Sequence, residues 1–358
     1  MEYVRYNNKY NKYTSIIRHH VPITTYTKPT SPPKSDEHYS INKNNEIPLS
    51  EIRNEDNAYQ PNNYENFPID ESKIYNNIPE FLQNVDIANK DNCIIYLLNW
   101  GCGMGSTLSV FAQNSYYLRS INPKIHVIPS FCKNTITFKY HDVSLNNSFF
   151  KYFKYLRDTD EIISPEIYFV RSLRMDGVIF FEREQPPLEQ VNSKILISHF
   201  RENFQLRIGN KVRNLISEIK DENKRPMIGL HIRSYFHNPD NGVPITDTFE
   251  NTFNTLKKSF DIKYGQYDIF VATDVTEYNV NIRNIFKSVY SLGDIDRIEN
   301  GQCDSIPLLK NVGFKLGSDI IYDCAALSSC DFVYITMSNI PIIVSMINAD
   351  TNMIEYHY

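Results

Sequence analysis

A histidine and an arginine two residues apart, His231 and Arg233, follow the short apolar segment 227–230. Pro226 precedes this segment, which is too short for a helix, so it predicts a buried strand. Side chains two residues apart leave the same face of a strand, and open α/β sheets bind ligands beyond the carboxyl ends of their strands. The guanidinium suits a phosphate, and the imidazole suits a sugar or base. The pattern therefore predicts a ligand site, although a surface ion pair beside a satisfied histidine also fits it.

A second candidate ligand is the carboxylate of Asp274, which follows the apolar segment 270–273. At the carboxyl end of a strand it could accept hydrogen bonds from the N1–H and amino groups of guanine. The same carboxylate could instead cap a helix that begins near Thr276. Both interpretations stay open at this point.

Polar residues Thr336, Ser338 and Asn339 come between a predicted strand at 332–335 and a predicted helix. Pro341 falls in the first turn of that helix, where its missing N–H costs nothing. Hydroxyls and free amides at a helix start can bind an anion, so we expect these residues to meet phosphates. The alternative is a serine cap with no ligand, which stabilises the helix by about 1 kcal/mol.

A glycine-rich loop at 101–106, with Gly103 and Gly105, separates a predicted strand from a predicted helix. Such a loop lets the backbone approach a ligand closely. It fits a dinucleotide site, an S-adenosylmethionine-dependent methyltransferase or a tight turn. Both cofactor sites expect an acidic residue after the next strand, whereas residues 128–131 contain none. A P-loop is excluded because no Gly-Lys-Ser/Thr follows.

A general base would complete a catalytic site, and Asp240 is our preferred candidate because it lies just past the Arg233 strand. Its surroundings, 238–242, also form a good turn sequence. Asp247 and Glu250 stand three residues apart and resemble a capping box, which would occupy both of them structurally.

The elements that must position these residues alternate between strands and helices. We expect strands at 93–98, 125–128, 227–230, 268–272 and 332–335, and helices at 108–118, 192–219, 249–260, 280–289, 318–327 and 338–346. Residues 136–185 mix short strands and loops, and 353–356 form a short apolar piece. This alternation predicts an α/β fold with two parallel sheets, each covered on both faces, and a cleft between them.

Composition limits the classes of function. The 358 residues carry a net charge of −5, which gives no electrostatic case for binding nucleic acid. The six cysteines show no metal-ligand spacing, so we expect reduced, buried thiols. Neither a signal peptide pattern nor a membrane-spanning apolar run is visible, so we expect a cytoplasmic protein. Residues 1–75 are polar and rich in Asn, Tyr, Lys, Ser and Pro, which predicts a poorly ordered extension.

Four of these segments occur in the order seen in GDP-fucose-dependent fucosyltransferases. They are the glycine-rich loop, residues 228–233, residues 270–274 and the final block 319–339. The chain resembles the α-1,6-fucosyltransferase and nodulation group most, with protein O-fucosyltransferases as relatives. The resemblance implies a GT-B fold with Rossmann-like domains at 76–222 (acceptor side) and 223–358 (nucleotide-sugar side), after the extension at 1–75.

The resemblance also implies an inverting, metal-independent glycosyltransferase that moves fucose from GDP-fucose to a glycan or protein hydroxyl, without a cofactor. His231 would lie near the nucleoside, Arg233 on the diphosphate and Asp274 on guanine, with the Ser338 region on the phosphates. The α-1,6 group has a second Arg and an acidic residue where this chain has Ser234 and Phe236. Two alternatives are the methyltransferase named above and a catalytically silent member of this fold.

Overall fold

The computed structural model of the chain describes residues 45–50, 52–53, 59, 64–65, 67–99, 104–132, 145–157, 165–172, 193–233, 247–295, 313–336 and 340–356. All of them belong to one compact unit, Ser40–Tyr358. Four of the predicted site residues, Gly103, Asp240, Ser338 and Asn339, lie outside the described residues.

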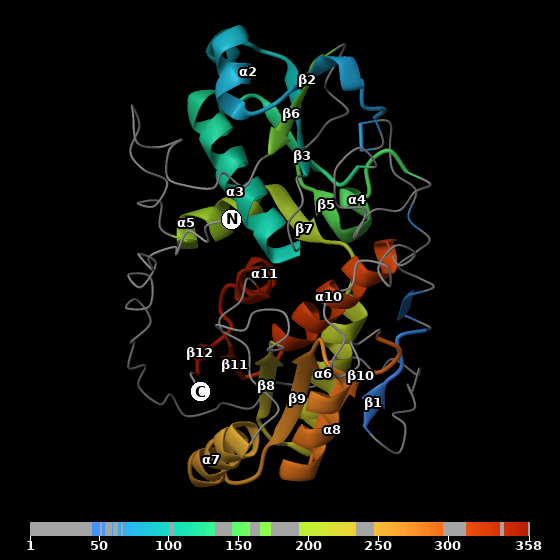
Figure 1. Cartoon of the computed structure of the whole chain (residues 1–358), viewed down its shortest axis with the longest axis vertical. Helices are drawn as coiled ribbons and strands as arrows, with labels where there is room; N and C mark the ends of the chain where they lie inside the picture. Colours follow the sequence, from blue (N-terminus) through green and yellow to red (C-terminus); the bar gives the residue numbers. More distant parts are fainter. Residues whose placement is uncertain are drawn as a thin grey trace, which may run out of the picture. The chain divides into compact units, whose positions relative to one another are not determined.

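The larger sheet has six strands in the order β1-β10-β9-β8-β11-β12, and all neighbouring strands run parallel. Its strands are β1 (Glu46–Ile47), β8 (Met227–Ile232), β9 (Asp268–Thr273), β10 (Val289–Leu292), β11 (Phe332–Ile335) and β12 (Met353–Glu355). The described helices from residue 210 onward are α6 (Asn210–Asn223), α7 (Asp247–Tyr264), α8 (Thr276–Ile285), α10 (Gly313–Leu327) and α11 (Ile340–Ile347). Figure 1 shows β8 and β9 side by side at the centre of this sheet.

Burial explains why β8 and β9 read as continuous apolar runs. All six residues of each strand are buried, as expected for parallel strands covered on both faces. Alternate residues of β8, including Leu230, pack in one core cluster with the aromatic stripe of α7 and with α8. The other face meets α10, because a Cβ added to Gly229 would lie 2.9 Å from Leu327 Cδ2. His231 is two residues after Gly229 and therefore lies on the same face of β8.

The smaller sheet has four parallel strands in the order β2-β6-β3-β4. They are β2 (Ile74–Tyr75), β3 (Cys93–Asn99), β4 (His126–Ser130) and β6 (Glu166–Ser172), and β5 (Phe153–Tyr155) forms an antiparallel pair with β7 (Phe204–Leu206). The helices here are α2 (Ile78–Asn84), α3 (Met104–Ile121), α4 (Phe149–Tyr152) and α5 (Ser193–Asn203). Two single turns are η1 (Glu71–Lys73) and η2 (Ile87–Asn89). The predicted α/β fold with parallel sheets is therefore confirmed.

The prediction of one long helix over 192–219 is wrong. The structure divides this segment into α5 and α6, with β7 and Gly209 between them. Gly209 is the N-cap of α6 and adopts φ +88, a left-handed conformation outside the helix, and a Cβ there would lie 2.9 Å from Ala325 Cβ. The apolar spacing continues through the break because both helices bury one face.

The helix predicted over 280–289 is displaced by four residues. The structure places α8 at Thr276–Ile285, and residues 289–292 form β10, whose four residues are all buried. A buried four-residue run has no periodicity of its own, so its apolar residues extended the helical pattern.

The polar N-terminal segment contributes to the larger sheet more than its composition indicates. Within it, β1 pairs with β10, and Ile47 and Leu49 are fully buried. Arg53 forms an ion pair with Asp319 of α10, whose side chain is buried, and donates to the carbonyl of Asp294 at 2.8 Å. These contacts attach residues 45–50, 52 and 53 to the edge of the sheet.

The segment before β8 packs with the larger sheet. Lys220 of α6 pairs with Asp331 at 2.8 Å and donates to the carbonyl of Ser329 at 3.1 Å, both just before β11. Asn223, the last residue of α6, donates to Asp268 of β9 at 2.8 Å. The boundary at residue 222 stays a prediction, and α6 lies on the side of the larger sheet.

Candidate functional site at the carboxyl edge of the larger sheet

Three neighbouring strands deliver predicted site residues to one edge of the larger sheet. In the register of the sheet, Ile232 of β8 faces Thr273 of β9, and Ile335 of β11 faces His231. The residues that follow these strand ends are Arg233, Asp274 and Thr336. Because the strands are parallel, their carboxyl ends meet, which is where open α/β sheets bind ligands.

Arg233 and Asp274 form an ion pair at this edge. Arg233 Nη1 donates to Asp274 Oδ2 at 3.1 Å, and the two side chains are 29% and 22% exposed. An ion pair was one of the two interpretations of Arg233, and here the partner is another predicted ligand. The bond uses one of the five N–H groups of the Arg233 guanidinium. Among the described residues, the Arg233 side chain forms no other hydrogen bond. Within the described part of the chain, the pair therefore leaves N–H donors of Arg233 free at the edge.

The N-cap of α8 is Val275, whose own side chain makes no capping hydrogen bond. The capping interpretation of Asp274 stays a prediction. The hydroxyl of Thr273 accepts from Val275 N at 3.3 Å, while Asp274 is directed to Arg233.

His231 is buried beside the ion pair, with 6% of its surface exposed. Its Nδ1 has no hydrogen-bond partner among the described residues. Burial, and then the charge of Arg233, lower the pKa of His231 to about 3, so the imidazole is neutral at physiological pH. A buried neutral ring with one unsatisfied nitrogen can donate to or accept from a ligand, depending on its tautomer.

Thr336 is 1% exposed, and its hydroxyl accepts from Arg233 N at 3.1 Å. Its own amide donates to the carbonyl of His231 at 3.3 Å. We expected this hydroxyl to meet phosphates, but the structure directs it to the backbone of Arg233.

Sequence reasoning missed Tyr356, whose hydroxyl also donates to the carbonyl of His231, at 3.3 Å. The sequence showed 353–356 only as a short apolar piece, and in the structure residues 353–355 form β12. Nothing local to Tyr356 indicates a partner 125 residues away.

The glycine-rich loop leads from β3 to α3, as predicted, and Gly105 is the second residue of that helix. Residues 101–103 lie outside the described part. The next strand, β4, ends at the buried Ser130 and offers no carboxylate, so neither cofactor interpretation of the loop gains support. A Cβ on Gly317 of α10 would lie 3.0 Å from Met104 Cε, so the start of α3 packs against α10.

The helix predicted from Ser338 is α11, which begins two residues later at Ile340. Pro341 is its second residue and therefore falls in the first turn, as expected. How Ser338 and Asn339 contact a ligand stays a prediction.

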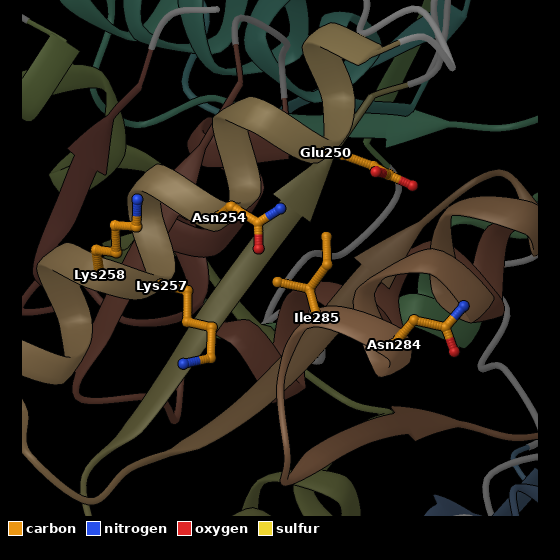
Figure 2. Close-up of a pocket in the computed structure, with 6 residues that line it drawn as sticks. All are labelled: Glu250, Asn254, Lys257, Lys258, Asn284 and Ile285. Atoms are coloured by element: carbon orange, nitrogen blue, oxygen red, sulfur yellow. The ribbon is translucent and has the colours of Figure 1, made fainter.

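A pocket of about 410 Å³ lies between α7 and α8. Figure 2 shows Asn254 of α7 and Ile285 of α8 facing one another across it. Its lining includes none of the predicted site residues, and Lys257, on its wall, pairs with Asp261 of the same helix at 2.7 Å. The pocket is therefore separate from the carboxyl edge.

Among the described residues, no group of three or more His, Cys, Asp or Glu side chains is placed to hold a metal ion. Among the helices in this part of the chain, none combines the length and apolar character needed to cross a membrane.

Comparison with known proteins finds no matching family model, and no curated protein matches the sequence. Among solved structures, the chain is similar to NodZ α-1,6-fucosyltransferase soaked with GDP-fucose, at 15% identity and a TM-score of 0.44, covering 72% of this chain and 93% of that one. It is similar to fucosyltransferase NodZ from Bradyrhizobium at 15% identity and a TM-score of 0.47, covering 75% and 96%. A FUT1 mutant from Arabidopsis thaliana in complex with GDP gives 10% identity and a TM-score of 0.39, covering 86% and 77%.

Proposed function

We propose that this chain is an inverting, metal-independent glycosyltransferase that moves fucose from GDP-fucose to a hydroxyl of a glycan or protein. One observation carries the proposal: the side chains of Arg233 and Asp274 and the buried, neutral His231 meet at the carboxyl edge of a parallel sheet. A nucleoside diphosphate needs a cation for its phosphates and directional donors or acceptors for its base and sugar. This edge offers both kinds of group.

In the proposed complex, Arg233 binds the diphosphate through the N–H groups that Asp274 does not use. Asp274 accepts from the N1–H and amino group of guanine, so the base competes with Arg233 for this carboxylate. His231 contacts the nucleoside. Backbone amides near Gly103 and Gly105, with Ser338 and Asn339, complete the phosphate contacts.

Transfer breaks the bond between fucose C1 and the diphosphate oxygen and forms a bond from C1 to the acceptor oxygen. The electron pair of the broken bond leaves with GDP, and the acceptor proton passes to a carboxylate, for which we propose Asp240. Arg233 stabilises the charge that grows on the leaving diphosphate. Loss of one such preorganised donor raises a barrier by about 3 kcal/mol.

The two parallel sheets support a GT-B arrangement, in which two Rossmann-like domains hold the donor between them. We assign the acceptor side to residues 76–222 and the nucleotide-sugar side to residues 223–358. The charged edge belongs to the second of these.

Calorimetry with GDP, ADP, UDP and S-adenosylmethionine tests the proposal. We expect a preference for GDP, and a loss of about a hundredfold in GDP affinity in Arg233→Ala, because a charge-assisted contact to phosphate disappears. Arg225→Ala is the matched control: Arg225 lies before the opposite end of β8 and pairs with Asp268 at 3.7 Å. Its loss should leave GDP affinity unchanged.

Binding without preference for GDP, or unchanged affinity in Arg233→Ala, would contradict the proposal. Binding of S-adenosylmethionine that Gly103→Val abolishes would favour the methyltransferase. GDP binding without transfer to any of a panel of glycan and protein acceptors would identify a silent member of the fold.

A further inference from the structure

The backbone of Arg233 is held by a neighbouring strand. β8 ends at Ile232, so the N–H of Arg233 lies beyond the last residue of its own strand. The hydroxyl of Thr336, just past β11, accepts this N–H at 3.1 Å. The amide of Thr336 donates to the carbonyl of His231 at 3.3 Å. Thr336 therefore binds the site strand on both sides of Ile232.

Tyr356 makes a second attachment from the next strand of the sheet. Its amide donates to the carbonyl of Ile335 at 3.1 Å, which continues the pairing of β12 with β11. Its hydroxyl crosses to the carbonyl of His231 at 3.3 Å. One carbonyl at the end of β8 thus accepts from both Thr336 and Tyr356.

Burial indicates what these hydroxyls do. Thr336 is 1% exposed and Tyr356 is 7% exposed, whereas the Arg233 side chain is 29% exposed. Both hydroxyls are bonded to the backbone that carries the guanidinium, and neither faces solvent.

We infer that Thr336 and Tyr356 are positioning residues for Arg233, which fix the backbone from which its guanidinium reaches the diphosphate. The inference rests on the proposed function and deepens it. It also changes the role expected of Thr336 from phosphate contact to support of the arginine. Support of this kind matters because a binding group must be held to within about 0.5 Å of its productive position.

Thr336→Val and Thr336→Ser provide the first test. Valine keeps the shape of threonine and removes the acceptor, which leaves the Arg233 N–H unsatisfied, while serine keeps the acceptor. We expect GDP affinity to fall by about tenfold in the valine variant and to stay within about twofold of wild type in the serine variant.

Guanosine separates positioning from general damage, since it has a base and a sugar but no phosphate for Arg233 to bind. Thr336→Val should lower the ratio of GDP to guanosine affinity, as Arg233→Ala does to a larger extent. A loosened fold would weaken both ligands together.

Tyr356→Phe should lower the ratio of GDP to guanosine affinity by about threefold. The effect is smaller than that of Thr336→Val because the lost hydrogen bond is long and the carbonyl of His231 still accepts from Thr336 N. Tyr334→Phe is the matched control. Tyr334 lies in the same core cluster, and its hydroxyl, 3.4 Å from that of Tyr264, touches neither His231 nor Arg233. It should leave the ratio unchanged.

The outcomes separate this inference from the proposed function. Wild-type protein that binds no GDP would overturn the proposed function and the inference with it. Wild-type protein that binds GDP, with the same ratio in Thr336→Val, would overturn the positioning roles alone. A fall in the ratio in Tyr334→Phe as large as in Tyr356→Phe would do the same.

Discussion

The described carboxyl ends of the strands differ in charge between the two sheets, although both sheets are parallel. In the larger sheet the edge carries Arg233 and Asp274, both partly exposed. In the smaller sheet β4 ends at the buried Ser130, and β6 ends at Ser172, whose hydroxyl accepts from Asn114 of α3 at 2.8 Å. Uncharged hydroxyls give little attraction to an anion. Among the described residues, charge at the strand ends, more than sheet topology, therefore distinguishes the edge of the larger sheet from these two strand ends of the smaller one.

The largest expected effect is on stability, at the contact of Gly317 of α10 with Tyr152 of α4. α10 packs on the larger sheet, and α4 lies beside the smaller one. A Cβ on Gly317 would lie 2.7 Å from Cζ of Tyr152, which is fully buried and cannot move aside. Gly317→Ala should therefore lower the free energy of unfolding by about 2 kcal/mol, despite the better helix propensity of alanine. Urea denaturation measures this.

Tyr152→Phe in the Gly317→Ala background should recover part of that loss, since the phenol oxygen is the group nearest the added carbon. A Gly317→Ala variant as stable as wild type would show that α10 does not pack closely on α4.

A buried histidine in each region allows an intermediate test. Burial lowers the pKa of both: His231, beside Arg233, to about 3, and His199 of α5, beside Arg119, to about 4. The unfolded chain, with a histidine pKa of about 6.5, binds more protons than the folded chain below that pH, so stability should fall as pH drops from about 6.5 toward 4. Urea unfolding between pH 4.5 and 7.5 measures the slope.

The two histidines differ in their partners. His199 Nε2 lies 3.0 Å from the hydroxyl of Ser115, whereas His231 Nδ1 has no partner among the described residues. Glutamine does not titrate, so replacing either histidine by glutamine should remove one of the protons that the unfolded chain takes up. The slope of the free energy of unfolding against pH should then be smaller. An unchanged slope in both variants would mean that neither ring is buried in its neutral form.

The smallest effect concerns the pocket between α7 and α8. Lys257 lines it and pairs with Asp261 within one helix, a partly exposed pair worth about 0.5 kcal/mol or less. Lys257→Ala should leave GDP affinity within about twofold of wild type, because none of the residues proposed to bind GDP lines this pocket. Calorimetry that gave a tenfold loss would move the site from the strand ends to this pocket.

Much of the fold and part of the site could be predicted, because both depend on local patterns. The apolar segments near His231, Asp274 and Thr336 placed three strand ends to within two residues, and parallel pairing then brought these residues to one edge. The elements that were missed have weak local signals. Residues 46–47 and 289–292 are too short to show a period, and the apolar spacing of α5 continues into α6 across Gly209.

The sequence by itself determined the alternation of strands and helices and the residue types at each strand tip, since hydrophobic periodicity and turn residues act over a few positions. Only the tertiary structure decided which side chains meet. It paired Arg233 with Asp274 across 41 positions and joined Tyr356 to the carbonyl of His231 across 125. Strand order sets these partners, and strand order depends on the packing of the whole sheet, which no local stretch of sequence encodes.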